Sequence, residues 1–335
     1  MSIEFVKGIA IFFVITLHVR DFDLWIPKII STAVPLFFMS TGFLLWLVYR
    51  DRFEAKKFLK SRVVRLFPDI YLVGLISVLL CLLFDMNELD GFWRWIYGDI
   101  RGFGPGSYYV SCYLLLCVCL VPLLMSFKTK WIVHLSFLYL LSHACLSFYK
   151  NEFFYLMFKE FPRWYITISP TQYFPHVLLG ILFASLCDRI ISHKERIFAV
   201  LFFVFLCFIL ESEGFYNGRF MWNKVDSVPF ESWETLYYGI LFCFSFFIVL
   251  YNLEFYINDK LKRPVIWMGE RSYQIFLVQA VYFKWINKVD LPLLNHGLSG
   301  FLVSVSVVVL SFIIYNYIYE YLRVISLKFL AVRIS

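Results

Sequence analysis

Two ionisable side chains lie within the first apolar segment of the sequence, KGIAIFFVITLH, which runs from Lys7 to His18. Their spacing of eleven residues is a rotation of about 1100° on an α-helix, so the two side chains point within about 20° of one face and lie about 16 Å apart along the axis. A neutral imidazole can act as a general base, and a nearby ammonium group supplies positive charge. A snorkelling lysine and an interfacial histidine would explain the same residues without chemistry, so both interpretations stay open.

The second apolar segment places two hydroxyl groups at membrane depth. Its sequence is VPLFFMSTGFLL, in which Ser40 and Thr41 are the polar residues. Hydroxyls in a membrane helix commonly donate to a backbone carbonyl one turn earlier. Taken alone, this segment therefore indicates helix packing.

Two arginines follow in the segment FLKSRVVRLFPDIY, where Arg62 and Arg65 are three residues apart. This spacing puts both side chains on one helix face, and Pro68 predicts the end of that helix near the membrane surface. A pair of guanidinium groups suits phosphate, because each can donate two parallel hydrogen bonds. A plain anchor at the cytoplasmic surface would explain the pair equally well, and this alternative also stays open.

The elements that hold these residues are predicted to be membrane helices. Of the 335 residues, 61% are hydrophobic and 16% are charged, whereas soluble domains have about 45–50% apolar and about 25% charged residues. A lipid solvent accounts for this excess, because lipid-facing positions are apolar as well. The formal net charge of +7 comes from basic residues placed between apolar segments, a pattern typical of topology signals and not of a nucleic-acid-binding face.

Ten segments of the sequence are long and apolar enough to cross a bilayer, which needs about 20 residues per helix. Backbone groups in lipid must be hydrogen-bonded within their own segment, so these segments are helices. We therefore predict an all-α integral membrane protein with about ten transmembrane helices, in which residues 1–335 form a single membrane domain without a soluble accessory domain. The ten segments are residues 3–20, 29–49, 68–86, 106–127, 130–149, 173–191, 195–211, 235–257, 266–287 and 297–321.

The distribution of basic residues predicts the orientation of the chain. With the N-terminus in the cytoplasm, most lysines and arginines fall on the inner side, including seven between Arg50 and Arg65. The outer loops 85–105 and 212–234 are then acidic on balance. Both termini are therefore predicted to be cytoplasmic. The eight cysteines lie in apolar segments without the spacing of zinc ligands, so we predict packing roles for them and no metal site.

In their order, these segments resemble the acyltransferase-3 family of bacterial membrane O-acyltransferases, which modify surface polysaccharides. The resemblance rests on the pair Lys7 and His18, on PLFFMSTGF, and on Arg62 and Arg65 ahead of Pro68. It continues in SYYVSCYLLLCVCLVPLL, YFPHVLLGILFA and MGERSYQIFLVQ, and thus covers nearly the whole chain.

The resemblance implies a role for each of these residues. His18 would act as a general base with Lys7 beside it, and both are the predicted catalytic residues. The residues predicted to bind the acyl donor are Arg62, Arg65, Ser40 and Thr41. The residues expected to line the substrate cavity are Phe38, Tyr109, His176, Ser272 and Gln279.

Two positions depart from the family pattern. Thr41 stands where serine is usual and keeps a hydroxyl group. Gln279 stands where histidine is usual, and an amide cannot act as an acid or base near neutral pH. Proton transfer is therefore not expected from the ninth segment.

The resemblance implies transfer of an acyl group, acetyl by preference, from cytoplasmic acyl-CoA to a hydroxyl of a surface or lipid-linked glycan, such as O-antigen or capsule. Acyl-CoA would be a co-substrate, no bound cofactor is expected, and the protein would reside in the bacterial inner membrane. No nucleophile elbow or activated cysteine is evident, which favours direct transfer, and an acyl-histidine intermediate stays open. The alternative function is a polytopic transporter or flippase of a glycan or a small anionic substrate. The acceptor, the acyl group and the oligomeric state are open.

Overall fold

The computed structural model of the chain describes residues 3–19, 32–83, 108–149, 170–187, 200–202, 204, 233–289 and 297–332. These residues form helices and no strand, in agreement with the predicted all-α class. The predicted seventh segment, 195–211, falls almost wholly outside the described residues, as do the predicted outer loops 85–105 and 212–234.

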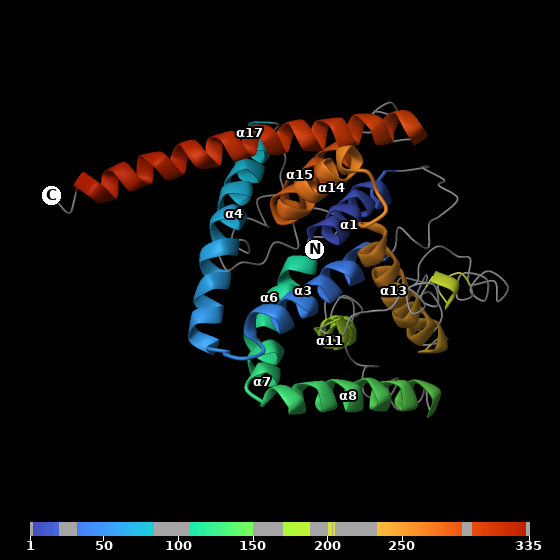
Figure 1. Cartoon of the computed structure of the whole chain (residues 1–335). Helices are drawn as coiled ribbons and strands as arrows, with labels where there is room; N and C mark the ends of the chain where they lie inside the picture. Colours follow the sequence, from blue (N-terminus) through green and yellow to red (C-terminus); the bar gives the residue numbers. More distant parts are fainter. Residues whose placement is uncertain are drawn as a thin grey trace.

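The observed helices follow the predicted segments closely at most positions (Figure 1). They are α1 (Ile3–Leu17), α3 (Ala33–Tyr49), α4 (Ala55–Leu83), α6 (Tyr108–Leu115), the π-helix η2 (Leu116–Leu120), α7 (Val121–Met125), α8 (Thr129–Tyr149), α11 (Pro170–Cys187), α13 (Trp233–Leu253), α14 (Asp259–Glu270), α15 (Ser272–Val289) and α17 (Gly297–Val332).

Two of the described helical stretches, Ala55–Leu80 and Gly297–Tyr321, have the length and apolar composition needed to cross a membrane. Shorter apolar stretches occur in α3, in α6 to α7, in α8, in α11 and in α13, each of which coincides with a predicted segment. The count of ten transmembrane helices and the cytoplasmic placement of both termini remain predictions.

Pro68 does not end a helix, contrary to the prediction from its position. Helix α4 continues through it from Ala55 to Leu83. Proline has no N–H, so the helix loses one backbone hydrogen bond at this position. The turn that follows Pro68 is held by contacts with other helices. Asp69, which follows Pro68, is buried and hydrogen-bonded to side chains of α15 and α17.

The predicted ninth segment is not one helix but two. Helix α14 ends at Glu270, α15 begins at Ser272, and Arg271 between them has φ −109° and ψ 11°. This conformation lies outside the α region, so the helix axis is interrupted. The interruption places the first turn of α15 at the cavity described below.

Glycines allow two pairs of helices to approach very closely. A Cβ atom at Gly42 of α3 would lie 1.9 Å from the carbonyl oxygen of Val177, and one at Gly180 of α11 would lie 2.0 Å from that of Met39. Helices α1 and α14 meet in the same way at Gly8 and Gly269. Because real Cβ atoms cannot come so near an oxygen, these crossings require glycine, as is common between membrane helices.

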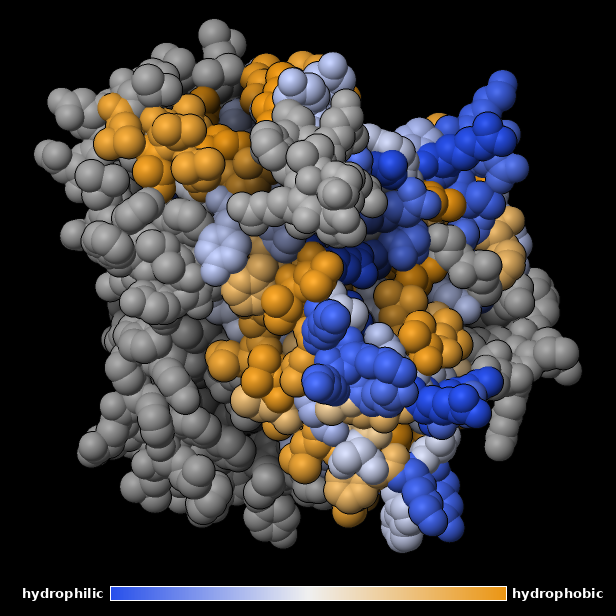
Figure 2. Space-filling view, turned by 90° about the vertical axis from the view of Figure 1, so that its left-hand side faces the viewer, coloured by the Kyte–Doolittle hydropathy of each residue, from blue (hydrophilic) through white to orange (hydrophobic). Residues whose placement is uncertain are grey.

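Large hydrophobic side chains remain exposed on several described helices. They include Leu79 and Leu82 of α4, Phe137 and Leu138 of α8, and Ile314 of α17. Figure 2 shows a face on which hydrophilic residues gather next to broad hydrophobic surface. Such a surface suits a lipid solvent, in which apolar side chains need not be buried against protein.

We predict that Gly180→Ala lowers the stability of the folded protein. The added methyl group would overlap the Met39 carbonyl, and overpacking of a tight contact typically costs about 1–3 kcal/mol. The midpoint of thermal unfolding of the detergent-purified protein measures the effect. Leu138→Ala, at an exposed position of α8, is the control and should change the midpoint little. An unchanged midpoint for Gly180→Ala would show that the two helices can separate without cost.

Candidate active site

A cavity with an open mouth lies where α1, α3, α4, α6 and α15 come together. Its volume is about 680 Å³, including the space at the mouth. Side chains from all five helices line it, so residues far apart in the sequence meet at one place. They are Lys7, Phe37, Ser40, Thr41, Leu44, Arg62, Arg65, Leu66, Tyr109, Tyr113, Ser272, Tyr273 and Phe276.

Three basic side chains, Lys7, Arg62 and Arg65, line the cavity, and none of its lining residues is acidic. Lys7 Nζ is 2.6 Å from Glu4 Oε2, one turn earlier on α1. The Arg62 guanidinium carbon lies 4.9 Å from the centre of the Phe58 ring, and its buried Nε has no hydrogen-bond partner among the described residues. The cavity therefore offers positive charge and an unpaired guanidinium N–H, which is the chemistry that binds phosphate or another anion.

The two hydroxyls at the cavity wall are already hydrogen-bonded to their own helix. Ser40 Oγ donates to the carbonyl oxygen of Leu36 at 2.7 Å, and Thr41 Oγ1 donates to that of Phe37 at 3.0 Å. Each oxygen keeps lone pairs that can accept a hydrogen bond from a ligand. While these bonds hold, the two residues can accept from a ligand but not donate to it.

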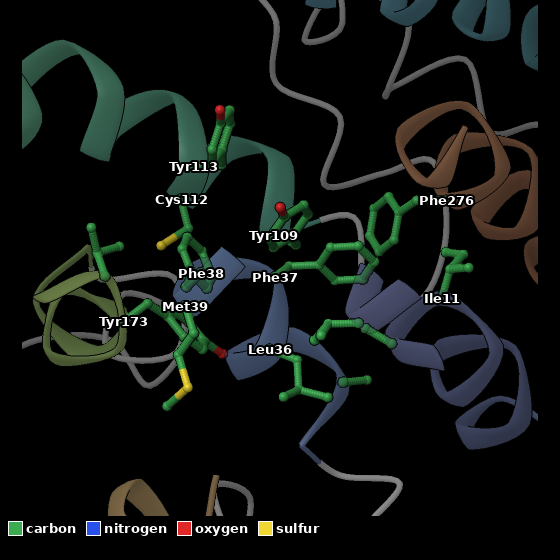
Figure 3. Close-up of a cluster of buried hydrophobic side chains, with 14 of the residues drawn as sticks. Ile11, Leu36, Phe37, Phe38, Met39, Tyr109, Cys112, Tyr113, Tyr173 and Phe276 are labelled. Atoms are coloured by element: carbon green, nitrogen blue, oxygen red, sulfur yellow. The ribbon is translucent and has the colours of Figure 1, made fainter. Parts of the chain in front are cut away.

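The inner wall of the cavity is aromatic. The Tyr109 ring of α6 lies 5.2 Å from that of Phe276 and 5.6 Å from that of Phe37, measured between centroids (Figure 3). Phe38 lies behind this wall, edge-on to Tyr109 at 5.1 Å and stacked on Tyr173 at 4.6 Å. A cavity lined by both aromatic and cationic side chains suits a ligand that has a charged end and an apolar end.

The helix that carries Tyr109 and Tyr113 changes to a π-helix at Leu116 and resumes as α7 at Val121. Pro122 stands in the first turn of α7, where a missing N–H is tolerated. Short π-helical insertions often occur at functional sites, because the extra residue re-aims the side chains of the neighbouring turns. Here the insertion comes directly after the turn that lines the cavity.

A buried carboxylate joins three helices beside the cavity. Asp69 Oδ1 accepts a hydrogen bond of 2.5 Å from the Tyr315 hydroxyl of α17, and Asp69 Oδ2 accepts one of 3.0 Å from Gln274 Nε2 of α15. The Tyr273 hydroxyl also donates to the Leu66 carbonyl at 3.2 Å. These bonds fix α4 against α15 and α17, and thus position the turn of α4 that carries Arg65.

The cavity brings together many of the residues that the sequence predicts for the site. Lys7, the two arginines and the two hydroxyls are all at its wall, as are two of the expected cavity residues, Tyr109 and Ser272. Neither Glu4 nor the partners of Asp69 are among the predicted site residues. Glu4 has a usable signal, since it lies three residues before Lys7, and so does Asp69, a lone acid in an apolar segment.

Four predicted site residues lie away from the cavity wall. His18 follows the last residue of α1 and its ring packs 5.5 Å from that of Phe283 of α15. Phe38, His176 and Gln279 are completely buried and do not line the cavity. Lys7 and His18 nevertheless both face α15, as their spacing predicts. Among the described residues, no group of three His, Cys, Asp or Glu side chains suits a metal ion.

A protein-family model described as an acyltransferase domain matches residues 2–316. The chain belongs to the acyltransferase-3 family. Comparison with curated proteins and with solved structures gave no match. The family assignment confirms the resemblance predicted from the ordered segments, and it makes the chain a membrane acyltransferase. In this acyltransferase-3 chain, the cavity with its basic residues is the candidate active site.

We predict that Tyr315→Phe destabilises this acyltransferase-3 protein by about 1.5–3 kcal/mol, the usual contribution of a hydrogen bond to a charged group. The substitution leaves Asp69 Oδ1 without its buried donor. Tyr317→Phe, on the same helix at a position that is 76% exposed, is the matched control and should have little effect. Thermal or denaturant unfolding in detergent compares the two. Equal stability of both variants would mean that the Asp69 contact does not hold the helices together.

Proposed function

We propose that the protein transfers an acyl group from cytoplasmic acyl-CoA to a hydroxyl of a surface or lipid-linked glycan at the bacterial inner membrane. Acetyl is the leading candidate for the acyl group. The observation that carries the proposal is the convergence of Lys7, Arg62 and Arg65 on one cavity in a chain of the acyltransferase-3 family. Acyl-CoA has phosphate groups at one end and an acyl thioester at the other. The cationic and aromatic residues of the cavity wall suit these two ends.

The two arginines are proposed to bind the phosphates of the donor. They lie one turn apart on α4, and both face the cavity. Their N–H groups find no carboxylate partner within the described part of the chain, so they are available for charge-assisted bonds. Lys7 adds a third positive charge to the cavity wall, and Glu4 pairs with its ammonium group.

His18 is proposed to act as the general base. Its imidazole would take the proton of the acceptor hydroxyl while that oxygen forms a bond to the thioester carbonyl carbon. The carbon–sulfur bond then breaks, CoA leaves as a thiolate, and the proton on His18 passes to the sulfur. Neither an oxidant nor a metal is needed for this exchange. His18 lies about 16 Å from Lys7 along α1, so the thioester end of the donor has to extend beyond the cavity.

A transfer assay tests the proposal as a whole. Membranes that contain the protein should move labelled acetyl groups from acetyl-CoA to glycan, or release them slowly as acetate when no acceptor is present. A transporter or flippase would do neither. Mass spectrometry of surface polysaccharide from cells with and without the gene would identify the acceptor.

We predict that the double substitution Arg62→Ala and Arg65→Ala raises the KM for acyl-CoA at least about tenfold, because charge-assisted hydrogen bonds contribute about 1.5–3 kcal/mol each. Replacement of both arginines by lysine should restore only part of the affinity, since lysine lacks the two-pronged donor geometry. Steady-state kinetics with purified protein measure the effect.

The matched control removes two basic residues that lie near the arginines but outside the cavity, Arg52 and Lys60, both of which are exposed. Their double replacement by alanine should leave the KM unchanged. If the cavity variant and this control behave alike, Arg62 and Arg65 act only as a membrane anchor.

We predict that His18→Ala lowers the rate of transfer by about 10²- to 10⁴-fold, the usual contribution of a general base. His18→Gln should fail as well, because an amide keeps a hydrogen bond but cannot take a proton. The position follows the end of α1, so both variants should insert and fold normally. The measurement is the acyl content of the glycan at matched protein level. Substantial activity in His18→Gln would exclude the base role.

A further inference from the structure

Gln279 carries a buried amide that has no role in the donor binding or acyl transfer proposed above. Its side chain is completely buried in α15. Neither Oε1 nor Nε2 has a hydrogen-bond partner in the described structure. Burial of an amide without hydrogen bonds costs free energy, and most buried polar groups in folded proteins are paired. The residue is therefore equipped to bind a polar group that arrives from outside the chain.

The position of Gln279 on α15 lies between the cavity and His18. Ser272, Phe276, Gln279 and Phe283 recur at intervals of four, three and four residues, which puts them on one helix face. Ser272 and Phe276 line the cavity, and Phe283 is in contact with the ring of His18. Gln279 is about 10 Å beyond Ser272 along this face.

Helix α1 follows the same route in the same direction. Lys7 and Ser272 meet at the cavity, and His18 and Phe283 meet beyond it. His18 comes eleven residues after Lys7 in the sequence, and Phe283 comes eleven residues after Ser272. The two helices therefore run side by side from the cavity to His18, and Gln279 lies on the face of α15 that follows this route.

We propose that Gln279 is a donor-binding residue whose amide hydrogen-bonds the amide groups in the pantetheine arm of acyl-CoA. The inference rests on the proposed function. A secondary amide offers one N–H and one carbonyl oxygen, and the carboxamide of Gln279 complements both. With the phosphates held by the arginines, the arm has to pass Phe276 and reach Gln279 before its thioester meets His18.

Binding measurements on the full-length protein in detergent separate this contact from the phosphate contacts. Coenzyme A carries the pantetheine arm, whereas adenosine 3′,5′-bisphosphate has phosphates and no arm. Gln279→Met keeps the length of the side chain and removes its hydrogen bonds. We expect it to weaken CoA binding about tenfold, the value of two ordinary hydrogen bonds, and to leave the affinity for the bisphosphate unchanged. Gln279→Leu is a second variant judged by the same ratio of affinities.

Stability without ligand distinguishes this role from a structural one. If the amide has no partner in the free protein, Gln279→Met removes an unpaired polar group and should leave the unfolding midpoint equal or higher. Ser245→Ala is the control for loss of a buried hydrogen bond that belongs to the fold, since the Ser245 hydroxyl donates to the Phe242 carbonyl at 2.9 Å. It should leave both affinities unchanged.

The possible outcomes separate the two proposals. An unchanged ratio of CoA to bisphosphate affinity in both Gln279 variants would overturn the role of Gln279 alone. A lower unfolding midpoint for Gln279→Met, with the two ligands weakened equally, would also overturn it and assign the amide to the fold. Failure of the unsubstituted protein to bind CoA or the bisphosphate would overturn the proposed function itself.

Discussion

Close backbone contacts at glycines fix two helices of the cavity wall, α1 and α3, against the neighbouring helices α14 and α11. In a bilayer, helices gain little from hiding apolar surface from one another, so their association depends on van der Waals packing. Gly8 and Gly42 each allow a carbonyl of a neighbouring helix to come against the backbone. Each glycine follows a cavity residue, Lys7 in α1 and Thr41 in α3. The contacts that anchor α1 and α3 thus also hold the turns that carry Lys7 and Thr41.

Electrostatics explain why the cavity is suited to an anion. Three cations surround it, and within the described residues only Lys7 among them has an ion-pair partner, Glu4. Charges near the membrane interior are costly unless they are paired or hydrated. An anion that enters the cavity would neutralise the repulsion between the arginines. The carboxylate nearest to them on α4, Asp69, is instead occupied by Tyr315 and Gln274.

Hydropathy and spacing predict most of the helix positions and much of the site, because both depend on local sequence. The pairing of Arg62 with Arg65 on one face and the shared direction of Lys7 and His18 follow from helix periodicity alone. The continuation of α4 through Pro68 does not, since it depends on bonds that Asp69 makes to distant helices. The interruption at Arg271 has only a weak signal, because the polar run from Gly269 to Gln274 lies between apolar segments without a proline.

The separation between the basic cavity and His18 is the constraint that the proposed reaction has to meet. Both places lie on α1 and beside α15, and a helix hydrogen-bonded along its length cannot shorten the distance between them. The substrate, and not the protein, must therefore cover the gap, and a long flexible donor arm is suited to do so. An apolar passage would accept the acyl end but reject the amides of such an arm. A buried carboxamide such as that of Gln279 would lower this penalty, because its hydrogen bonds would replace those to the water that these amides lose on entry.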